Sequence, residues 1–158
     1  MNEYPLEKLL VLRERRKDEA TDNVRHIQNK IRHEVELLET LNKNLADYKE
    51  WKDEEINRRY NTIIDTIKTQ DELISFNQGI AGLSTKEDEI QCSIVTKQKE
   101  IDDLQLELSK ALEIMHSAQK SLQKIESHKN LFKERIKKEL LYKEELELED
   151  FKVKSKTW

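Results

Sequence analysis

The chain contains very little glycine, proline or cysteine: of its 158 residues, two are Gly, one is Pro and one is Cys. A compact fold with many elements needs glycine and proline at its turns, because these residues supply or preset the backbone angles that turns require. This composition provides for one or two reversals of the chain, and it therefore predicts few elements of great length. The single cysteine, Cys92, excludes an internal disulfide.

The sequence also lacks a strong charge of one sign and any long apolar run. It has 29 basic against 33 acidic residues and a net charge of -4, which provides no overall attraction to nucleic acid or to an anionic membrane. No apolar run approaches the roughly 18 to 20 residues of a membrane-spanning helix. The N-terminal residues 1–5 lack the basic start and apolar stretch of a signal peptide. We therefore expect no nucleic-acid partner, no membrane insertion and a cytoplasmic location.

Charged residues are abundant, at 39% of the chain, yet the apolar residues recur at alternating steps of three and four. This alternation is typical of the apolar seam of a coiled coil, and it argues against disorder. In the C-terminal half the seam runs through Ile90, Ile94, Lys97, Ile101, Leu104, Leu108, Ala111, Met115, Ala118, Leu122, Ile125, Lys129, Phe132 and Ile136, and weakens at Glu139, Lys143 and Leu146. In the N-terminal half it runs through Ala20, Val24, Ile27, Ile31, Leu38, Leu41, Leu45 and Tyr48. After an irregularity at Trp51 and Lys52 it resumes at Ile56, Tyr60, Ile63, Ile67 and Ile74.

The sequence predicts an all-α fold, a long two-helix antiparallel coiled-coil hairpin that forms a single domain over residues 1–158 and is monomeric. Both glycines, Gly79 and Gly82, lie in residues 75–84, where we place the turn. Ser84 and Glu87 then form a capping box for the second helix. The expected elements are a helix over about 5–74, a helix over about 85–150 and a frayed tail over 151–158. A reversal at the glycines pairs residue i with about 160 minus i, which places Arg13, Arg15, Arg16 and Lys17 beside Glu144, Glu145 and Glu147.

Candidate chemistry is sparse in this chain. His26 and His33 share a helical face but are separated by two turns, about 10 Å, which is too far for one zinc ion. The sequence that begins at His33 and Glu34 lacks the second histidine of a zinc-protease helix. We find no glycine-rich phosphate loop, and no nucleophile with a plausible base. The sequence therefore predicts no catalytic, cofactor or metal site, and a protein that is not an enzyme.

Two surfaces remain as candidates for binding a partner. The first is a basic patch formed by Lys8 and residues 13–17, which either pairs with the glutamates near residue 144 or docks an acidic partner. The second is the predicted turn with its shoulders, which is unusually apolar for an exposed hairpin tip and contains Leu73, Ile74, Phe76, Ile80 and Leu83. It either closes the hairpin by local packing or is an exposed partner site. We assign partner-binding residues to the irregularity, at Trp51, or to the tip, at Phe76, Ile80 and Leu83.

The N-terminal run resembles the opening of the YscO proteins of type III secretion systems and of their flagellar counterpart FliJ. The residues that carry this resemblance are Tyr4, Pro5, Leu6, Glu7, Lys8, Leu9, Leu10, Val11, Leu12, Arg13, Arg16 and Ala20. The families also share this length, this high charge and a helical hairpin that covers nearly the whole chain.

The resemblance implies a stalk or adaptor at the base of the secretion apparatus, similar to the gamma subunit of rotary ATP synthases, with the paired helix ends inside the pore of the secretion ATPase hexamer. It further implies contacts with the export gate protein and with secretion chaperones or the needle-length regulator. The positions that match and would contact the ATPase are Leu6, Leu9, Leu10, Arg13 and Arg16. The alternatives are a generic cytoplasmic scaffold or tether, such as a parallel coiled-coil homodimer, and a helical holdase chaperone.

Overall fold

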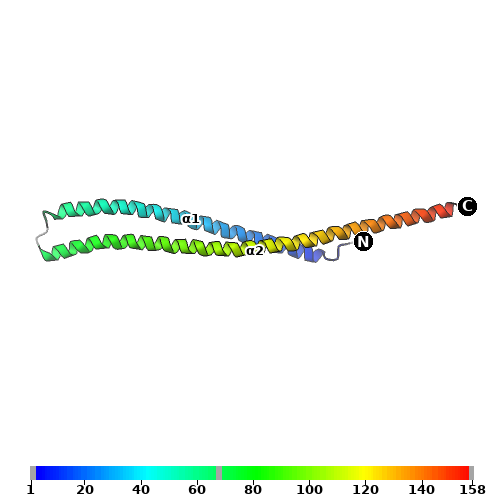
Figure 1. Ribbon diagram of the computed structural model, residues 1–158, viewed down its shortest axis with the longest axis horizontal. Helices are drawn as coiled ribbons and strands as arrows, with labels where there is room; N and C mark the ends of the chain where they lie inside the picture. Colours follow the sequence, from blue (N-terminus) through cyan, green and yellow to red (C-terminus); the bar gives the residue numbers. More distant parts are fainter. Residues whose placement is uncertain (1–2, 67–68, 157–158) are drawn as a thin grey trace. The chain divides into compact units, whose positions relative to one another are not determined.

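The structure, a computed structural model, describes residues 3–66 and 69–156. Helix α1 spans Glu7–Ile63 and helix α2 spans Gln70–Lys156, with 57 and 87 residues. The described ranges contain no strand, and the two helices pack against each other side by side (Figure 1). The predicted all-α helical hairpin is therefore confirmed. Residues 67 and 68 of the predicted first helix, and residues 157 and 158 of the predicted tail, lie outside the described ranges.

The prediction that the chain reverses at residues 75–84 is wrong. Both glycines lie inside α2, and the reversal falls between Ile63 and Gln70. Glycine costs a helix only about 1 kcal/mol relative to alanine, and no described glycine has a positive φ. Two glycines are therefore tolerated in a helix that gains its stability from packing along its length.

Thr69 marks the start of α2. Its hydroxyl accepts a hydrogen bond from the backbone N–H of Glu72 at 3.3 Å, and Asp71 and Glu72 place negative charge in the first turn, where the helix dipole favours it. The pattern Thr-x-x-Glu is the same capping pattern that we assigned to Ser84 and Glu87. The assignment to Ser84 is wrong, because Ser84 lies within α2.

The change in the position of the turn also changes which residues face each other. Three hydrogen bonds between α2 and the N-terminal half show which residues face each other: Tyr4–His128, Arg13–Ser121 and Glu34–Lys97. The two residue numbers of these pairs add up to 132, 134 and 131. The predicted pairing of residue i with 160 minus i is therefore wrong by more than twenty residues. The predicted contacts of residues 13–17 with the glutamates at 144–147 do not form.

Two compact units make up the chain, and each contains segments of both helices. The first combines the residues up to Arg25 with those from Ser109 onward, and its core is the cluster of Tyr4, Leu10, Leu122 and Ile125. Leu9 and Phe132 pack against this cluster and are themselves partly buried. The second unit is His26–Leu108, in which the buried apolar side chains are Ile27, Leu83 and Ile101. The helices run antiparallel within each unit, which does not fit the alternative of a continuous parallel homodimer.

The seam predicted for the C-terminal half is confirmed by burial. Every predicted position from Ile90 to Ile136 is buried or half-buried, whereas Glu139, Lys143 and Leu146 are exposed. Near this end of the described residues Tyr4 contacts Phe132, and the half-buried positions of α2 end at Ile136. Beyond Ile136 every described side chain of α2 is exposed, and the helix nevertheless continues to Lys156. The predicted frayed tail is helical in its described part.

In α1 the irregularity expected at Trp51 and Lys52 is a run of charged seam positions. Half-buried residues continue at steps of three and four through Tyr48, Lys52, Glu55 and Arg59. An apolar pattern cannot reveal these positions, because none of the last three residues is apolar. Trp51 itself is exposed, and so are Tyr60 and Ile74, where the seam was predicted to resume.

Candidate interaction surfaces

The five residues assigned to the ATPase contact fall into two groups in the first unit. Leu10 is only 5% exposed and Leu9 is partly buried, so both belong to the hydrophobic core between α1 and α2. Leu6 and Arg16 are exposed, and of these five residues they are the ones whose side chains a partner can reach most directly.

Arg13 is half-buried. Its guanidinium donates a hydrogen bond of 2.8 Å to the backbone carbonyl oxygen of Ser121 on α2. Beside it opens a groove of about 580 Å³ between the two helices, in which Arg13 and Arg16 form the basic edge and Ile114 is an apolar wall. The remaining lining residues are Glu19, Ala20, Asn23, Ser117, Ala118 and Ser121. The basic patch predicted from sequence therefore borders a groove and does not meet the glutamates near residue 144.

Sequence reasoning missed the part that Tyr4 plays in the first unit. The Tyr4 side chain is buried, with its hydroxyl 2.5 Å from Nδ1 of His128. Its ring meets that of Phe132 edge-on at 5.4 Å between centroids, and the ammonium group of Lys129 lies 5.9 Å from its centroid. Lys129 also forms an ion pair of 2.8 Å with Glu7. Tyr4 thus fastens the residues before α1 to α2, a role that its separation of more than 120 residues from these partners hid.

The three residues assigned to a hairpin tip, Phe76, Ile80 and Leu83, lie along α2 and not at the turn. Leu83 is buried, and its carbonyl oxygen accepts a hydrogen bond of 2.7 Å from the hydroxyl of Tyr48. Phe76 and Ile80 are half-buried, and the Phe76 ring packs edge-on against Tyr60 at 5.1 Å. For Leu83 and Phe76 the local-packing interpretation therefore describes what these side chains do.

Trp51 differs from the other three residues of that assignment. Its side chain is 46% exposed, and its ring lies 5.6 Å from the ring of Tyr48. Trp51 therefore presents a partly exposed aromatic surface beside a neighbouring ring. A large aromatic side chain held in this way can serve as an anchor for a protein partner.

Charged pairs occupy the seam of the second unit. Lys52 of α1 forms an ion pair with Glu87 of α2, with both side chains about 15% exposed, and Lys49 approaches the same carboxylate at 3.9 Å. The hydrogen bond to Glu87 raises the pKa of Lys52 above its usual value. Nearer the other end of this unit, Lys97 of α2 donates to Glu34 of α1 at 2.6 Å. The hydrogen bond lowers the pKa of Glu34 and raises that of Lys97.

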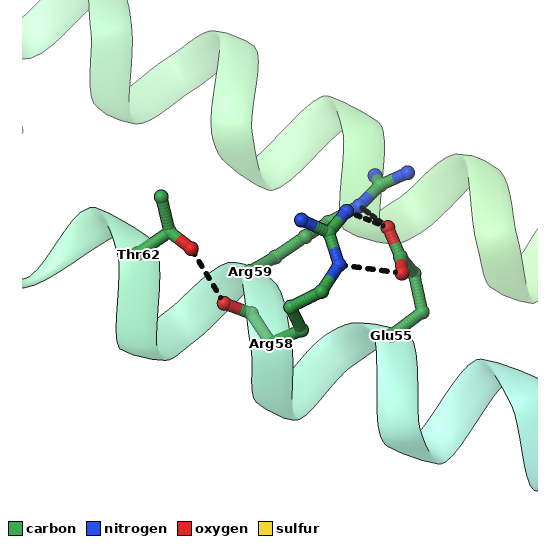
Figure 2. A network of polar contacts seen from close by, with 4 residues as sticks. All are labelled: Glu55, Arg58, Arg59 and Thr62. Atoms are coloured by element: carbon green, nitrogen blue, oxygen red, sulfur yellow. Dashed lines mark hydrogen bonds and ion pairs between the residues drawn. The ribbon is translucent and has the colours of Figure 1, made fainter.

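A third charged group lies on one helix. Figure 2 shows the carboxylate of Glu55 between the guanidinium groups of Arg58 and Arg59, with hydrogen bonds of 2.5 to 3.0 Å. These hydrogen bonds hold the pKa of Glu55 at about 2 and raise that of Arg58. The Arg59 guanidinium also lies 3.2 Å from where a Cβ at Gly79 would be. The glycine therefore leaves room for this arginine between the helices.

The described residues contain no group of three or more histidine, cysteine or acidic side chains placed to hold a metal ion. All four histidines are exposed along the helices, and His128 also bonds Tyr4. In the part of the chain that the structure describes, neither helix has a stretch long and apolar enough to cross a membrane.

Comparison with known proteins identifies the family. The model of the type III secretion protein YscO matches residues 6–154. The crystal structure of the type III secretion protein YscO from Vibrio parahaemolyticus superposes with a TM-score of 0.81 at 24% identity, and the match covers 92% of each chain. No protein of curated function matches the chain. Since the family model covers nearly all of the two helices, the chain belongs to the YscO family of type III secretion proteins.

Proposed function

We propose that this protein is a non-enzymatic stalk or adaptor of a bacterial type III secretion system. In this proposal it binds the hexamer of the secretion ATPase at the cytoplasmic base of the apparatus and couples it to the export gate and to chaperones or the needle-length regulator. The observation that carries the proposal is the family match over residues 6–154, which supports a role in type III secretion. The contact with the ATPase goes beyond this match, and we argue it from the exposed residues of the first unit.

Symmetry supports a coupling role for a helical hairpin. Two antiparallel helices of 57 and 87 residues have no rotational symmetry that matches a six-membered ring. Such a pair, seated in the ring, contacts the six subunits unequally and stabilises different conformations in different subunits. Binding of this kind changes ATP turnover without any catalytic group on the stalk.

The predicted contact residues differ in exposure, and we assign them different roles accordingly. Arg16 and Leu6 are exposed and would touch the ATPase directly. Arg15 and Lys8, also exposed, add positive charge to the same part of α1 and favour an acidic surface on the ATPase. Leu9, Leu10 and Arg13 would act by holding α1 against α2 in the geometry that presents the exposed residues.

The second unit supplies the surface that we assign to the other partners. Trp51 is an exposed aromatic side chain of this unit, and Ile80 is half-buried. Contacts with the export gate or with chaperones would use Trp51 first. Leu83 and Phe76, which pack within the hairpin, would support that surface from beneath.

The test is an ATPase assay of the secretion ATPase with increasing amounts of this protein. We expect stimulation that saturates, and a loss of most of it with the charge reversal Arg15→Glu together with Arg16→Glu. The matched control is Arg32→Glu with Lys43→Glu, which makes the same change in charge at exposed positions of the second unit and should stimulate like the natural protein. Absence of stimulation at saturating ratios, or equal loss in both double variants, would refute the ATPase contact.

A further inference from the structure

The part of α2 that follows the first unit's core is exposed on all sides. From Lys137 to Ser155 every described side chain is exposed, and the exposed apolar residues include Leu140, Leu141 and Tyr142. The glutamates of this segment are those expected from sequence to meet the arginines of α1, and the structure leaves them away from α1. This segment therefore has a surface that a partner can contact.

One line of side chains begins before this segment, at Leu131, and continues into it to Glu149 at steps of four and three, the spacing of a coiled-coil contact. We call this line the exposed stripe. It consists of Leu131, Arg135, Lys138, Tyr142, Glu145 and Glu149, all of them exposed. It is distinct from the seam that packs on α1, whose residues here are Leu122, Ile125 and Phe132. A partner can therefore lie along the stripe without displacing α1.

The charges of the stripe are divided between its two halves. Its first half contains Arg135 and Lys138, and its second half contains Glu145 and Glu149. A shallow groove of about 480 Å³ lies over the first half, lined by Leu131, Glu134, Arg135, Lys138, Glu139 and Tyr142. A helix with a basic half followed by an acidic half is complementary in charge to an antiparallel copy of itself.

We propose that the exposed stripe pairs with the stripe of a second copy of this chain in an antiparallel homodimer. Residue i of one copy then faces about residue 280 minus i of the other, and the two-fold axis passes near Leu140. Arg135 faces Glu145 twice, once on each side of the axis, as a two-fold interface requires. Lys138 faces Tyr142, where the lysine can lie over the aromatic ring. A parallel pairing would instead place Arg135 on Arg135 and Glu145 on Glu145, which like-charge repulsion disfavours.

The dimer is weak and depends on salt. The stripe covers only about two and a half heptads and offers Leu131 and Tyr142 as its apolar residues, so little apolar area is buried. Most of the attraction is between exposed charges, which about 0.1 M salt screens beyond roughly 10 Å. This pairing does not depend on the proposed ATPase contact, and it adds a concentration-dependent dimer to the monomer expected from sequence.

Sedimentation velocity of the full chain across a concentration series tests the pairing. The natural protein should associate at about 50 mM salt and dissociate at about 0.5 M. Two charge-reversed variants, R135E with K138E and E145K with E149K, should each associate roughly tenfold more weakly. Their equimolar mixture should regain the affinity of the natural protein, because each reversed half then faces an oppositely charged half. Far-UV circular dichroism confirms that these exposed changes leave the helices intact.

The matched controls reverse the same number of charges away from the stripe: K137E with K143E, and E144K with E147K. Both should associate like the natural protein. Association that persists in the two stripe variants, or no gain on mixing them, would overturn the proposal, as would a natural protein that stays monomeric throughout the series. Weakening by R15E with R16E and by E145K with E149K, but not by R135E with K138E, would show that the acidic half meets α1 of the second copy, and would also overturn it.

The orientation has its own measurement. On a background in which the exposed Cys92 is changed to serine, one variant has Arg135→Cys and the other has Glu145→Cys. A mixed disulfide between these two variants under mild oxidation is expected for the antiparallel pair. A disulfide between two copies of the Arg135→Cys variant in preference to the mixed one would indicate a parallel pair and overturn the proposal.

Discussion

The ammonium group of Lys97 on α2 lies 2.6 Å from the carboxylate of Glu34 on α1, and the two side chains are each 22% exposed. Both residues occupy positions of the seam where the spacing calls for an apolar side chain. A charged pair at such a position fixes which residues of the two helices face each other, because a shifted pairing leaves both charges half-buried and unmatched.

We predict that Lys97→Met lowers the midpoint of thermal unfolding, because Glu34 then remains half-buried without the lysine. The double change Glu34→Leu with Lys97→Leu should unfold at a higher temperature than Lys97→Met, since an apolar pair of similar size replaces the charged pair. Circular dichroism at 222 nm measures both midpoints. Glu100→Gln, which removes the exposed second partner of Lys97, is the control and should change the midpoint little. A double variant no more stable than Lys97→Met would contradict this account of the pair.

Glu55 predicts a dependence of stability on pH. Its pKa in the folded chain is about 2, below the roughly 4.3 of an unperturbed glutamate. Folding therefore favours the ionised form, so this contribution to the free energy of unfolding is fully present above about pH 5 and is lost as the pH falls toward 2. In Glu55→Gln the free energy of unfolding should fall less steeply over that interval than in the natural protein. Urea unfolding at a series of pH values checks this, with Glu54→Gln as the exposed control; curves of equal slope for Glu55→Gln and the natural protein would be the adverse result.

The core of the first unit predicts one large loss of stability. Ile125 is 3% exposed and lies in the cluster with Tyr4 and Leu10. Ile125→Ala should lower the free energy of unfolding by about 2 to 4 kcal/mol, from lost apolar contact and the cavity that remains. Leu141→Ala, at an exposed position of the same helix, should change it by less than about 0.5 kcal/mol. Denaturant unfolding measures both, and similar effects of the two changes would show that Ile125 is not in a core.

Replacing a glycine by alanine stabilises a helix but destabilises a turn that needs glycine, so such changes test whether Gly79 and Gly82 lie in a helix. A Cβ at Gly82 would meet nothing within 4 Å, so Gly82→Ala should stabilise the helix by up to about 1 kcal/mol. At Gly79 a Cβ would come within 3.2 Å of the Arg59 guanidinium, which must shift, so Gly79→Ala should stabilise less. Denaturant unfolding compares the two variants. Clear destabilisation by Gly82→Ala would support a turn at this place and contradict the structure.

The positions of the seam could be predicted from sequence wherever apolar residues fill them, as from Ile90 to Ile136. The location of the turn could not, because two sites share the same capping pattern and the sequence does not rank them. Thr69 caps α2, whereas Glu87 of the other site pairs with Lys52 across the seam. Only the pairing of distant residues decides between them.

The candidate surfaces could be predicted only in part, because the sequence does not show which distant residues pair. Arg16 and Trp51 are exposed as the basic patch and the aromatic site require, but Leu10 and Leu83 are buried. Burial of a residue at one end of a helix depends on where the second helix lies, and the predicted pairing was displaced by more than twenty residues. Tyr4 was overlooked as a core residue because its partner His128 is distant in sequence.

All of the surfaces described above depend on the reversal between Ile63 and Gln70, and a distance between two spin labels tests it most directly. One label is attached to the natural, exposed Cys92 on α2 and the other to Asn42→Cys on α1. The structure places these positions almost opposite each other, so the measured separation should be below about 20 Å, given helix axes about 10 Å apart. A reversal at Gly79 to Gly82 would move them about 26 residues out of step, and a separation near 40 Å would contradict the account.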